Sequence, residues 1–390
     1  MATRLPFVME PDWTDGVSET LSWKTDVMIS PSGAEQRIAR RLSPRRLYEF
    51  TVLAGHTDAR MLENQLFLAG GITWDMPIFP DVAQLSAPIS AGSQVIAIPT
   101  SGRDFVVGDN LLLKGGFGIM ASQQVATIQS LDAQSITVTS ALSAWPAGSF
   151  LYPMRPAVFT DTPAITRYND SLMRVQLRVR LAAHNPHAAA MDTPLYRGHP
   201  VLEQDADWVD DLTAEYQRQL LELDNETGIP YRTDTAGRAF VMQQHVWAQI
   251  GREVQSRLRS QLYYLRGRQR AIWVASQAAD VIPVAASGST LTVALAGYSE
   301  YGVMPGRRDL RLLLSDGTRL YRRIISATRQ TEHEQLALDG EVPPLSAISQ
   351  VSLMALCRQN TDDITWEHTT DADGFAQVST TFRGLRDELE

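Results

Sequence analysis

The sequence predicts an α+β protein, mainly β, made of two tandem diverged repeats, each with strands, one helix and a small β-barrel or sandwich unit. Three observations predict this class. Short apolar and β-branched runs alternate with glycine turns over residues 90–158 and 283–356. Few segments carry the three- and four-residue apolar spacing of a helix. The order of rare residues, tryptophan above all, recurs about 195 positions later.

Each β-rich stretch contains four predicted strands between glycine turns. In the first they are Gln94–Pro99, Asn110–Lys114, Gln123–Ile128 and Ser135–Thr139. In the second they are Thr290–Leu295, Leu310–Leu314, Arg319–Ile325 and Gln335–Leu338. Both stretches are typical of small closed or nearly closed β-units. A closing strand follows each, at Ser171–Leu181 and at Phe375–Phe382.

Three segments are candidate helices. Asp58–Leu68 has apolar residues on one face, Thr57 or Asp58 as N-cap, and Gly70–Gly71 as a stop. Arg252–Leu265 has the same spacing and ends at Gly267. The third candidate is Trp208–Leu223, whose start is marked by the acids Asp205, Asp207, Asp210 and Asp211. Acids at a helix start cap free N–H groups, so they need no catalytic role.

An internal repeat divides the chain into residues 1–195 and 196–390. Asp12-Trp13-Thr14-Asp15 recurs as Asp207-Trp208-Val209-Asp210, 195 residues later. Gln65-Leu66-Phe67 recurs as Gln261-Leu262-Tyr263 at an offset of 196, and Trp74 recurs as Trp273 at 199. A slow drift of the offset is what small loop insertions cause. We therefore expect two copies of one unit with the same order of elements.

Composition limits the function classes. The net charge of −9 argues against broad nucleic-acid binding, and no apolar run reaches the length of a membrane span. The start lacks a signal-peptide pattern, so a soluble, unprocessed protein is expected. Cys357 is the single cysteine, which excludes an intramolecular disulfide and fits a reducing cytoplasm. Lys24 and Lys114 are the only lysines, and neither belongs to a phosphate-binding loop.

No group of residues predicts a catalytic, cofactor or metal site. His184, His187, His199 and Asp192 have the residue types of a zinc site, but Pro186 and the Ala/Pro-rich context favour a solvated linker. Glu332-His333-Glu334 and Trp366-Glu367-His368 are interpreted as surface turns. The sequence therefore predicts a protein that is not an enzyme and needs no cofactor.

The candidate functional residues are contact residues. A dense basic run contains Arg37, Arg40, Arg41, Arg45 and Arg46, and the second copy retains only Arg232 and Arg238 there. Guanidinium groups are favoured at protein interfaces. The alternative is a solvated strand or hairpin whose arginines pair with local acids. Trp13 and Trp208, at equivalent positions, are candidate anchors, and Trp74 and Trp273 are expected mainly in the core.

A family resemblance rests on residues 20–85. Ser32-Gly33-Ala34-Glu35-Gln36-Arg37, a Tyr/Phe strand, a helix ending in Phe67-Leu68-Ala69-Gly70-Gly71, and Trp74 followed by Phe79-Pro80-Asp81 stand in this order. This pattern resembles the distal tail or tail-hub proteins of long-tailed bacteriophages and of related gene transfer agents. In the second copy Pro230 replaces the glutamate, and no Phe-Pro-Asp follows Trp273.

The resemblance implies a virion structural protein at the distal end of a phage tail, in the tail hub or baseplate. It implies a ring that connects the tail tube to the tail tip, assembled in the bacterial host cytoplasm. The implied partners are the tube protein, the tip or hub proteins and other copies of the chain, with DNA only as cargo in the channel and no membrane insertion. Two copies per chain favour a trimer with pseudo-sixfold symmetry, and a hexamer is the alternative.

A different function stays open, namely a receptor- or carbohydrate-binding β module of the tail tip. Such a module needs an exposed aromatic platform, for which Trp145, Tyr298 and Tyr301 are the candidates.

Overall fold

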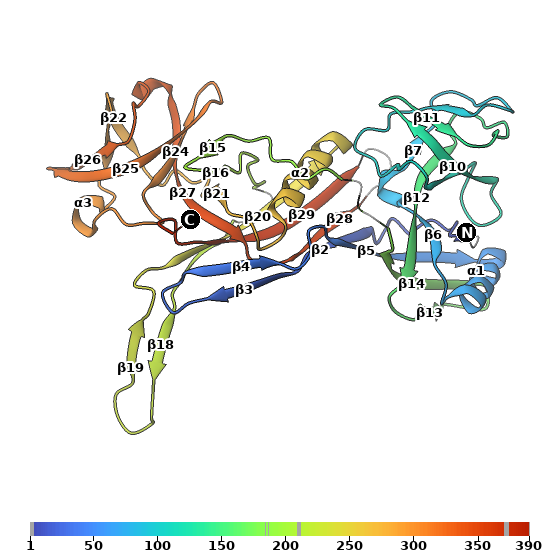
Figure 1. The fold of residues 1–390 in the computed structure, drawn as a ribbon, viewed down its shortest axis with the longest axis horizontal. Helices are drawn as coiled ribbons and strands as arrows, with labels where there is room; N and C mark the ends of the chain where they lie inside the picture. Colours follow the sequence, from blue (N-terminus) through green and yellow to red (C-terminus); the bar gives the residue numbers. More distant parts are fainter. Residues whose placement is uncertain (1–3, 184, 186, 209–211, 370–373, 390) are drawn as a thin grey trace.

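The computed structural model describes every residue except 1–3, 184, 186, 209–211, 370–373 and 390 (Figure 1). Strands account for 47% of the chain and helices for 10%, which confirms the mainly β, α+β class. None of the helices in the described part is long and apolar enough to cross a membrane.

One run of eight antiparallel strands forms the centre of the main sheet (Figure 1). The order is β13 (Ala164–Arg167), β14 (Leu172–Leu181), β5 (Arg45–Gly55), β2 (Val17–Ser22), β28 (Asp363–His368), β29 (Phe375–Gly384), β20 (Phe240–Ile250) and β17 (Ala214–Gln217). The first four strands come from the first half of the chain and the last four from the second half. The two halves therefore meet where β2 pairs with β28.

The two faces of this run differ. On one face, side chains such as Val52, Val175 and Val378 are buried. The helices α1 (His56–Ala69) and α2 (Arg252–Leu265) cover this face through Leu62 and Leu258, respectively. The opposite face carries polar side chains that are exposed or half-buried, among them Ser18, Glu49, Gln176, Glu367 and Gln377. Alternation along each strand explains the division.

Each half also carries a separate β-unit, and the two units lie at opposite ends of the long axis (Figure 1). The first unit orders β7 (Ala83–Gln84), β12 (Phe150–Phe159), β9 (Asn110–Lys114), β10 (Gln123–Leu131), β11 (Ser135–Val138) and β8 (Val95–Ala97). The second orders β27 (Ile348–Gln359), β24 (Asp309–Leu314), β25 (Arg319–Gln330), β26 (His333–Leu338), β23 (Thr290–Ala294) and β22 (Pro283–Ser287). Each encloses its own apolar core. Among the described residues, no ladder joins the first and last strand of either unit, so strand pairing leaves the predicted barrels open.

The remaining elements connect these parts. β1 (Leu5–Pro6) runs parallel to β6 (Trp74–Pro77), which pairs with β12. In the second half, β21 (Ile272–Ala275) pairs with β27, and Val201, just after β16 (His199–Pro200), forms a parallel bridge with Trp273. β16 pairs with β15 (Leu195–Tyr196). The short helices are η1 (Phe79–Asp81), η2 (Leu345–Ala347) and α3 (Tyr298–Tyr301).

Two hairpins extend from the sheet, and we call them the first and second arms. The first arm, residues 25–39, contains β3 (Thr25–Ile29) and β4 (Glu35–Ala39). The second arm, residues 220–234, contains β18 (Leu220–Leu223) and β19 (Tyr231–Asp234). The first arm runs along the body of the molecule, whereas the second projects away from it (Figure 1).

The ladders of the two halves correspond strand by strand. Phe50 faces Leu177 between β5 and β14, and His245 faces Thr380 between β20 and β29. In this alignment β20 follows β5 by 195 residues, and β29 follows β14 by 203 residues. The two arms align at 195 and the helices at 196. β13 aligns with β28, and β2 with β17, which has the same position next to β20 that β2 has next to β5.

The predicted elements match closely, with two corrections. Arg252–Leu265 is helical as predicted, and the first helix spans His56–Ala69 with Gly55, instead of Thr57 or Asp58, at its N-cap. The predicted helix Trp208–Leu223 is wrong, because this segment contains the strands β17 and β18. Its counterpart in the first half contains β2 and β3, so pairing with β20 determines its conformation more than local preference does.

The acids assigned to the start of that helix have other roles. The carboxylate of Asp205 pairs with Arg311 at 2.5 Å and Arg319 at 2.7 Å, and that of Asp207 accepts the Ala248 amide. Asp210 and Asp211 lie outside the described residues.

Candidate assembly surfaces

The basic run divides between the surface and the interior. Arg40 pairs with Asp26 at 2.6 Å on the exposed first arm. Arg41 donates to the backbone carbonyls of Ser22 and Trp23 at 3.3 Å, and Arg37 is half-buried on β4. Arg45 is exposed at the start of β5. Local acids and carbonyls therefore engage part of this run, whereas Arg45 is exposed and has no salt bridge among the described residues.

Arg46 is buried inside the chain, which corrects its prediction as a surface contact. Its guanidinium donates to Glu19 at 3.0 Å, and to Asp104 and Tyr48. The Glu19 carboxylate also accepts two hydrogen bonds from Arg259 of α2, both at 2.7 Å. Because successive strand residues point to opposite faces, Arg45 and Arg46 have opposite environments. Through Glu19, which Arg46 and Arg259 share, the cluster joins the first half to the second.

Ion pairing keeps this buried cluster charged. Burial by itself raises the pKa of Glu19, but Arg259 and Arg46 outweigh it and hold that pKa well below its usual value. The His368 imidazole lies 3.3 Å from Glu19, and burial lowers the His368 pKa. Trp366 and His368 are thus interior residues of β28, and Glu334 is buried on β26, which overturns their interpretation as surface turns.

The junction between the halves is itself an interface between two similar units. The β2 and β28 strands pair over six residues each, from Val17 opposite His368 to Ser22 opposite Asp363. The Asp362 carboxylate accepts the Thr25 amide at 2.6 Å and the Arg268 amide at 2.9 Å. Sheet pairing and charge-assisted hydrogen bonds therefore hold the halves together.

The first arm adds a second contact across this junction. Its Glu35 side chain, 1% exposed, lies between Arg358, at 2.6 Å, and Arg383. The backbone of Gly33, at φ +83°, packs so closely on the Phe240 ring that a Cβ there would lie 2.3 Å from a ring carbon. Gly33 is therefore required by both its backbone conformation and its contact.

The run of eight strands ends in two open edges. β13 pairs with β14, β17 pairs with β20, and every residue of both strands is exposed. Their outer backbone groups have no ladder partner among the described residues. Natural proteins usually protect such edges, because an open edge recruits another strand. These edges correspond to β28 and β2, which pair with each other at the internal junction.

The candidate anchor tryptophans occupy different environments. Trp13 is half-buried against the core of the first half, whereas Trp208 is 65% exposed. Trp74 and Trp273 are both buried, as expected. They lie in different clusters, however, and the ladders place Ile272, rather than Trp273, at the position of Trp74.

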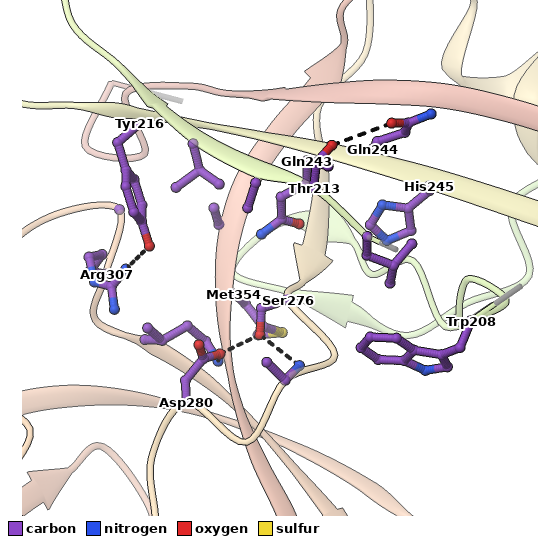
Figure 2. A pocket seen from close by; sticks show the side chains of 17 residues that line it. Trp208, Thr213, Tyr216, Gln243, Gln244, His245, Ser276, Asp280, Arg307 and Met354 are labelled. Atoms are coloured by element: carbon purple, nitrogen blue, oxygen red, sulfur yellow. Dashed lines mark hydrogen bonds between the residues drawn. The ribbon is translucent and has the colours of Figure 1, made fainter. Parts of the chain in front are cut away.

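A cavity of about 250 Å³ lies beside Trp208, between β17, β20 and the second β-unit (Figure 2). His245 borders it at the position that Phe50 occupies in the first half. Phe50 packs against Phe79 with ring centroids 5.3 Å apart. Ser276 donates to Asp280 in this cavity, but no hydrogen bond among the described residues joins Ser276 to His245. Among the described residues of the cavity, no histidine accepts a hydrogen bond from the Ser276 hydroxyl.

The other sequence candidates do not come together. Trp145 and Tyr298 are buried and only Tyr301 is exposed, so these three do not form one exposed aromatic platform. Cys357 is buried and free, and burial raises its pKa. The candidate zinc ligand His184 lies outside the described residues. Among the described ones, no group of His, Cys, Asp and Glu has the arrangement of a metal site.

The features missed by sequence reasoning are the strand β17 and the two open edges. The repeat contained the signal for β17, since 212–217 align with β2. No protein-family model matches the chain, and no curated protein sequence matches it.

Proposed function

We propose that this protein is a ring-forming structural component of the distal end of a phage tail. The observation that carries the proposal is the pair of open sheet edges, which are the counterparts of the two strands paired inside the chain. Joining β17 of one copy to β13 of the next would repeat the β2–β28 junction between chains. Because each contact leaves another free edge, the assembly continues until it closes into a ring.

Two further features support the same junction. Asp161, the counterpart of Asp362, is exposed beside β13. Phe67 on α1 is 89% exposed. Its counterpart Tyr263 on α2 is buried and packs edge-on against Trp23, with the ring centroids 5.6 Å apart. The free end thus exposes an aromatic group and a carboxylate, the latter 3.4 Å from Arg178.

The tail assignment rests on the family resemblance, together with this assembly geometry. Three chains supply six similar units, which suits a part that connects a sixfold tube to a threefold tip. The α-helices cover one face of the sheet, so the open polar face is the one that would line a channel for DNA. A mixed polar lining lets DNA pass without strong adhesion.

The test is the mass of the assembled full chain by native mass spectrometry and analytical ultracentrifugation. We expect a closed species of three 43.2 kDa chains. Electron micrographs should then show threefold particles with six similar lobes. A protein that stays monomeric at high micromolar concentration, or that forms open-ended chains, would contradict the ring. If purified tails from a producing phage lack the protein, the tail assignment fails.

A receptor-binding module is the second candidate. The exposed Tyr301 beside the second β-unit is the observation in its favour. Saturable binding to a glycan array, lost on Tyr301→Ala, would support it.

A further inference from the structure

The second arm is a hairpin that extends away from the body of the molecule (Figure 1), and its apolar side chains are exposed. It is a separate two-stranded sheet. Its large exposed apolar residues are Leu220, Leu221, Leu223, Ile229 and Tyr231, with Ile229 at the tip 99% exposed. An isolated hairpin is marginally stable in water, and a cluster of exposed apolar residues indicates a binding surface.

The first arm shows what an arm of this kind binds. Its tip lies on the second half, where Gly33 packs on Phe240 and Glu35 is enclosed by two arginines. Arg386 also donates to the Ser32 carbonyl at 2.9 Å. The arm thus reaches past the strand junction and holds the neighbouring unit through an acidic residue on a basic surface.

Strand register identifies the corresponding surface on the first half. Arg383 faces Met242 in its ladder and Arg180 faces Leu47, so Arg180 is the counterpart of Arg383. In the same way, Val158 corresponds to Arg358, because Val158 faces Arg180 and Arg358 faces Arg383. We call Arg45, Val158 and Arg180 the basic corner.

The basic corner is free to receive a partner. Arg45, at the position of Phe240, and Arg180 are both exposed. Neither has a salt bridge among the described residues, although most arginines of the sheet are paired with acids. Arg180 faces Leu47, two residues after Arg45, so both cations lie on the same face of neighbouring strands. Without a counter-charge they favour an acidic partner.

The tip of the second arm carries that charge. Glu222, Asp224 and Glu226 are exposed along it, and the Asp224 carboxylate bends the tip by accepting the Glu226 amide at 2.8 Å. Pro230 stands at the position of Glu35. The acids of the second arm therefore lie on β18 and in the turn that follows it, rather than at the start of the returning strand. Compared with the first arm and its binding surface, the two sets of differences are complementary. The second arm carries acids and Ile229, and the basic corner carries Arg45 in place of Phe240 and Val158 in place of Arg358.

We propose that the second arm docks on the basic corner of a second copy of this chain. Asp224 and Glu226 then pair with Arg45 and Arg180, and Ile229 covers Val158. The arm starts beside the open edge strand β17, so it crosses to the next chain wherever β17 pairs with β13. The inference rests on the proposed ring and adds a clasp to each junction between chains.

A charge-swap experiment on the full chain tests the clasp, with self-association measured by sedimentation velocity. The variant Asp224→Arg with Glu226→Arg should weaken the association between chains by about tenfold or more, as should Arg45→Glu with Arg180→Glu. The combined four-site variant should return to within about threefold of the parent. Glu300→Arg with Glu332→Arg, two exposed acids on the second β-unit, is the matched control and should leave association unchanged.

The outcomes separate the clasp from the ring. If the parent forms a ring and the arm variant behaves like the control, the clasp is overturned and the ring stands. If the four-site variant associates no more strongly than either two-site variant, the proposed pairing is also overturned. If the parent chain does not assemble at all, both proposals fail. Unchanged circular dichroism and melting temperature establish that the exposed substitutions leave the fold intact.

Discussion

At the scale of single residues, the environment of a side chain depends on which sheet face it occupies. Arg45 and Arg46 are adjacent, yet one is exposed and the other is 4% exposed and bound to Glu19 and Asp104. A buried guanidinium without a partner carboxylate costs several kcal/mol. Removing one partner of the Arg46 cluster would therefore destabilise the fold, whereas Arg45 lies outside on the exposed face.

Gly33 provides a residue-level prediction with an internal control. Gly33→Ala places a Cβ against the Phe240 ring and forces alanine into a left-handed conformation. We expect the free energy of unfolding to fall by about 2 kcal/mol, measured by urea titration. Gly228→Ala, at the equivalent position of the second arm, has nothing within 4 Å of its Cβ and should change stability by under about 0.5 kcal/mol. Equal effects would contradict the contact.

His245 makes stability depend on pH. Burial lowers its pKa to about 4, an effect that Asp205 only partly opposes. The unfolded chain therefore binds a proton near pH 6.5 that the folded chain does not bind until about pH 4. The free energy of unfolding should fall as the pH drops from 6.5 to 4, by at most about 3 kcal/mol from this residue.

The variant His245→Phe, which carries the residue of the equivalent position Phe50, should lose this component. Urea titrations at pH 7 and pH 4.5 measure it for both proteins. If the parent and the variant show the same pH dependence of stability, the His245 pKa does not differ between the folded and the unfolded chain.

At the scale of elements, the two helices are equivalent in position and different in exposure. Tyr263 on α2 is 4% exposed, because the first half covers it, whereas Phe67 and Leu68 on α1 are 89% and 82% exposed. Helices in the same architectural position are expected to bury the same face. In the proposed ring, the exposed end of α1 would lie against the neighbouring chain.

Replacing Phe67 and Leu68 by serine should weaken association between chains by about tenfold or more, with little change in stability. Sedimentation velocity and thermal melting measure the two effects. The control replaces Val95 and Ile325, exposed by 52% and 60% on the two β-units, with serine. Association equally affected by both pairs would count against a role for α1.

At the scale of the whole molecule, the internal junction predicts the register between chains. Glu19 faces Trp366 inside the chain, and their counterparts are Ala214 on β17 and Ile165 on β13. Facing residues of antiparallel strands lie within disulfide distance.

The variant Ala214→Cys with Ile165→Cys should therefore cross-link different chains on oxidation. Non-reducing electrophoresis should give dimers and trimers, with no larger species from a closed trimer. Ala214→Cys with Thr166→Cys is the control, because Thr166 points to the other face. Cys357 is buried and should not interfere. Equal cross-linking of both variants would refute the register.

Much of the fold followed from local pattern. The strands around Asn110–Lys114 and the helix Arg252–Leu265 are set by short-range periodicity and glycine turns, and the structure has both. The segment 208–223 misled because its acids resemble helix caps, while its conformation depends on pairing with β20, which is distant in sequence. Of the predicted site, the sequence located the basic run but not which of its arginines reach solvent.

The sequence by itself determined the class, the two β-units and the recurring order of residues, since these depend on neighbours a few positions apart. Only the tertiary structure decided that β2 joins β28 and that β13 and β17 remain open. Strand pairing is a long-range contact, and its register sets which side chains are covered. The property that matters for assembly, which surfaces the chain leaves uncovered, exists only once the halves have packed together.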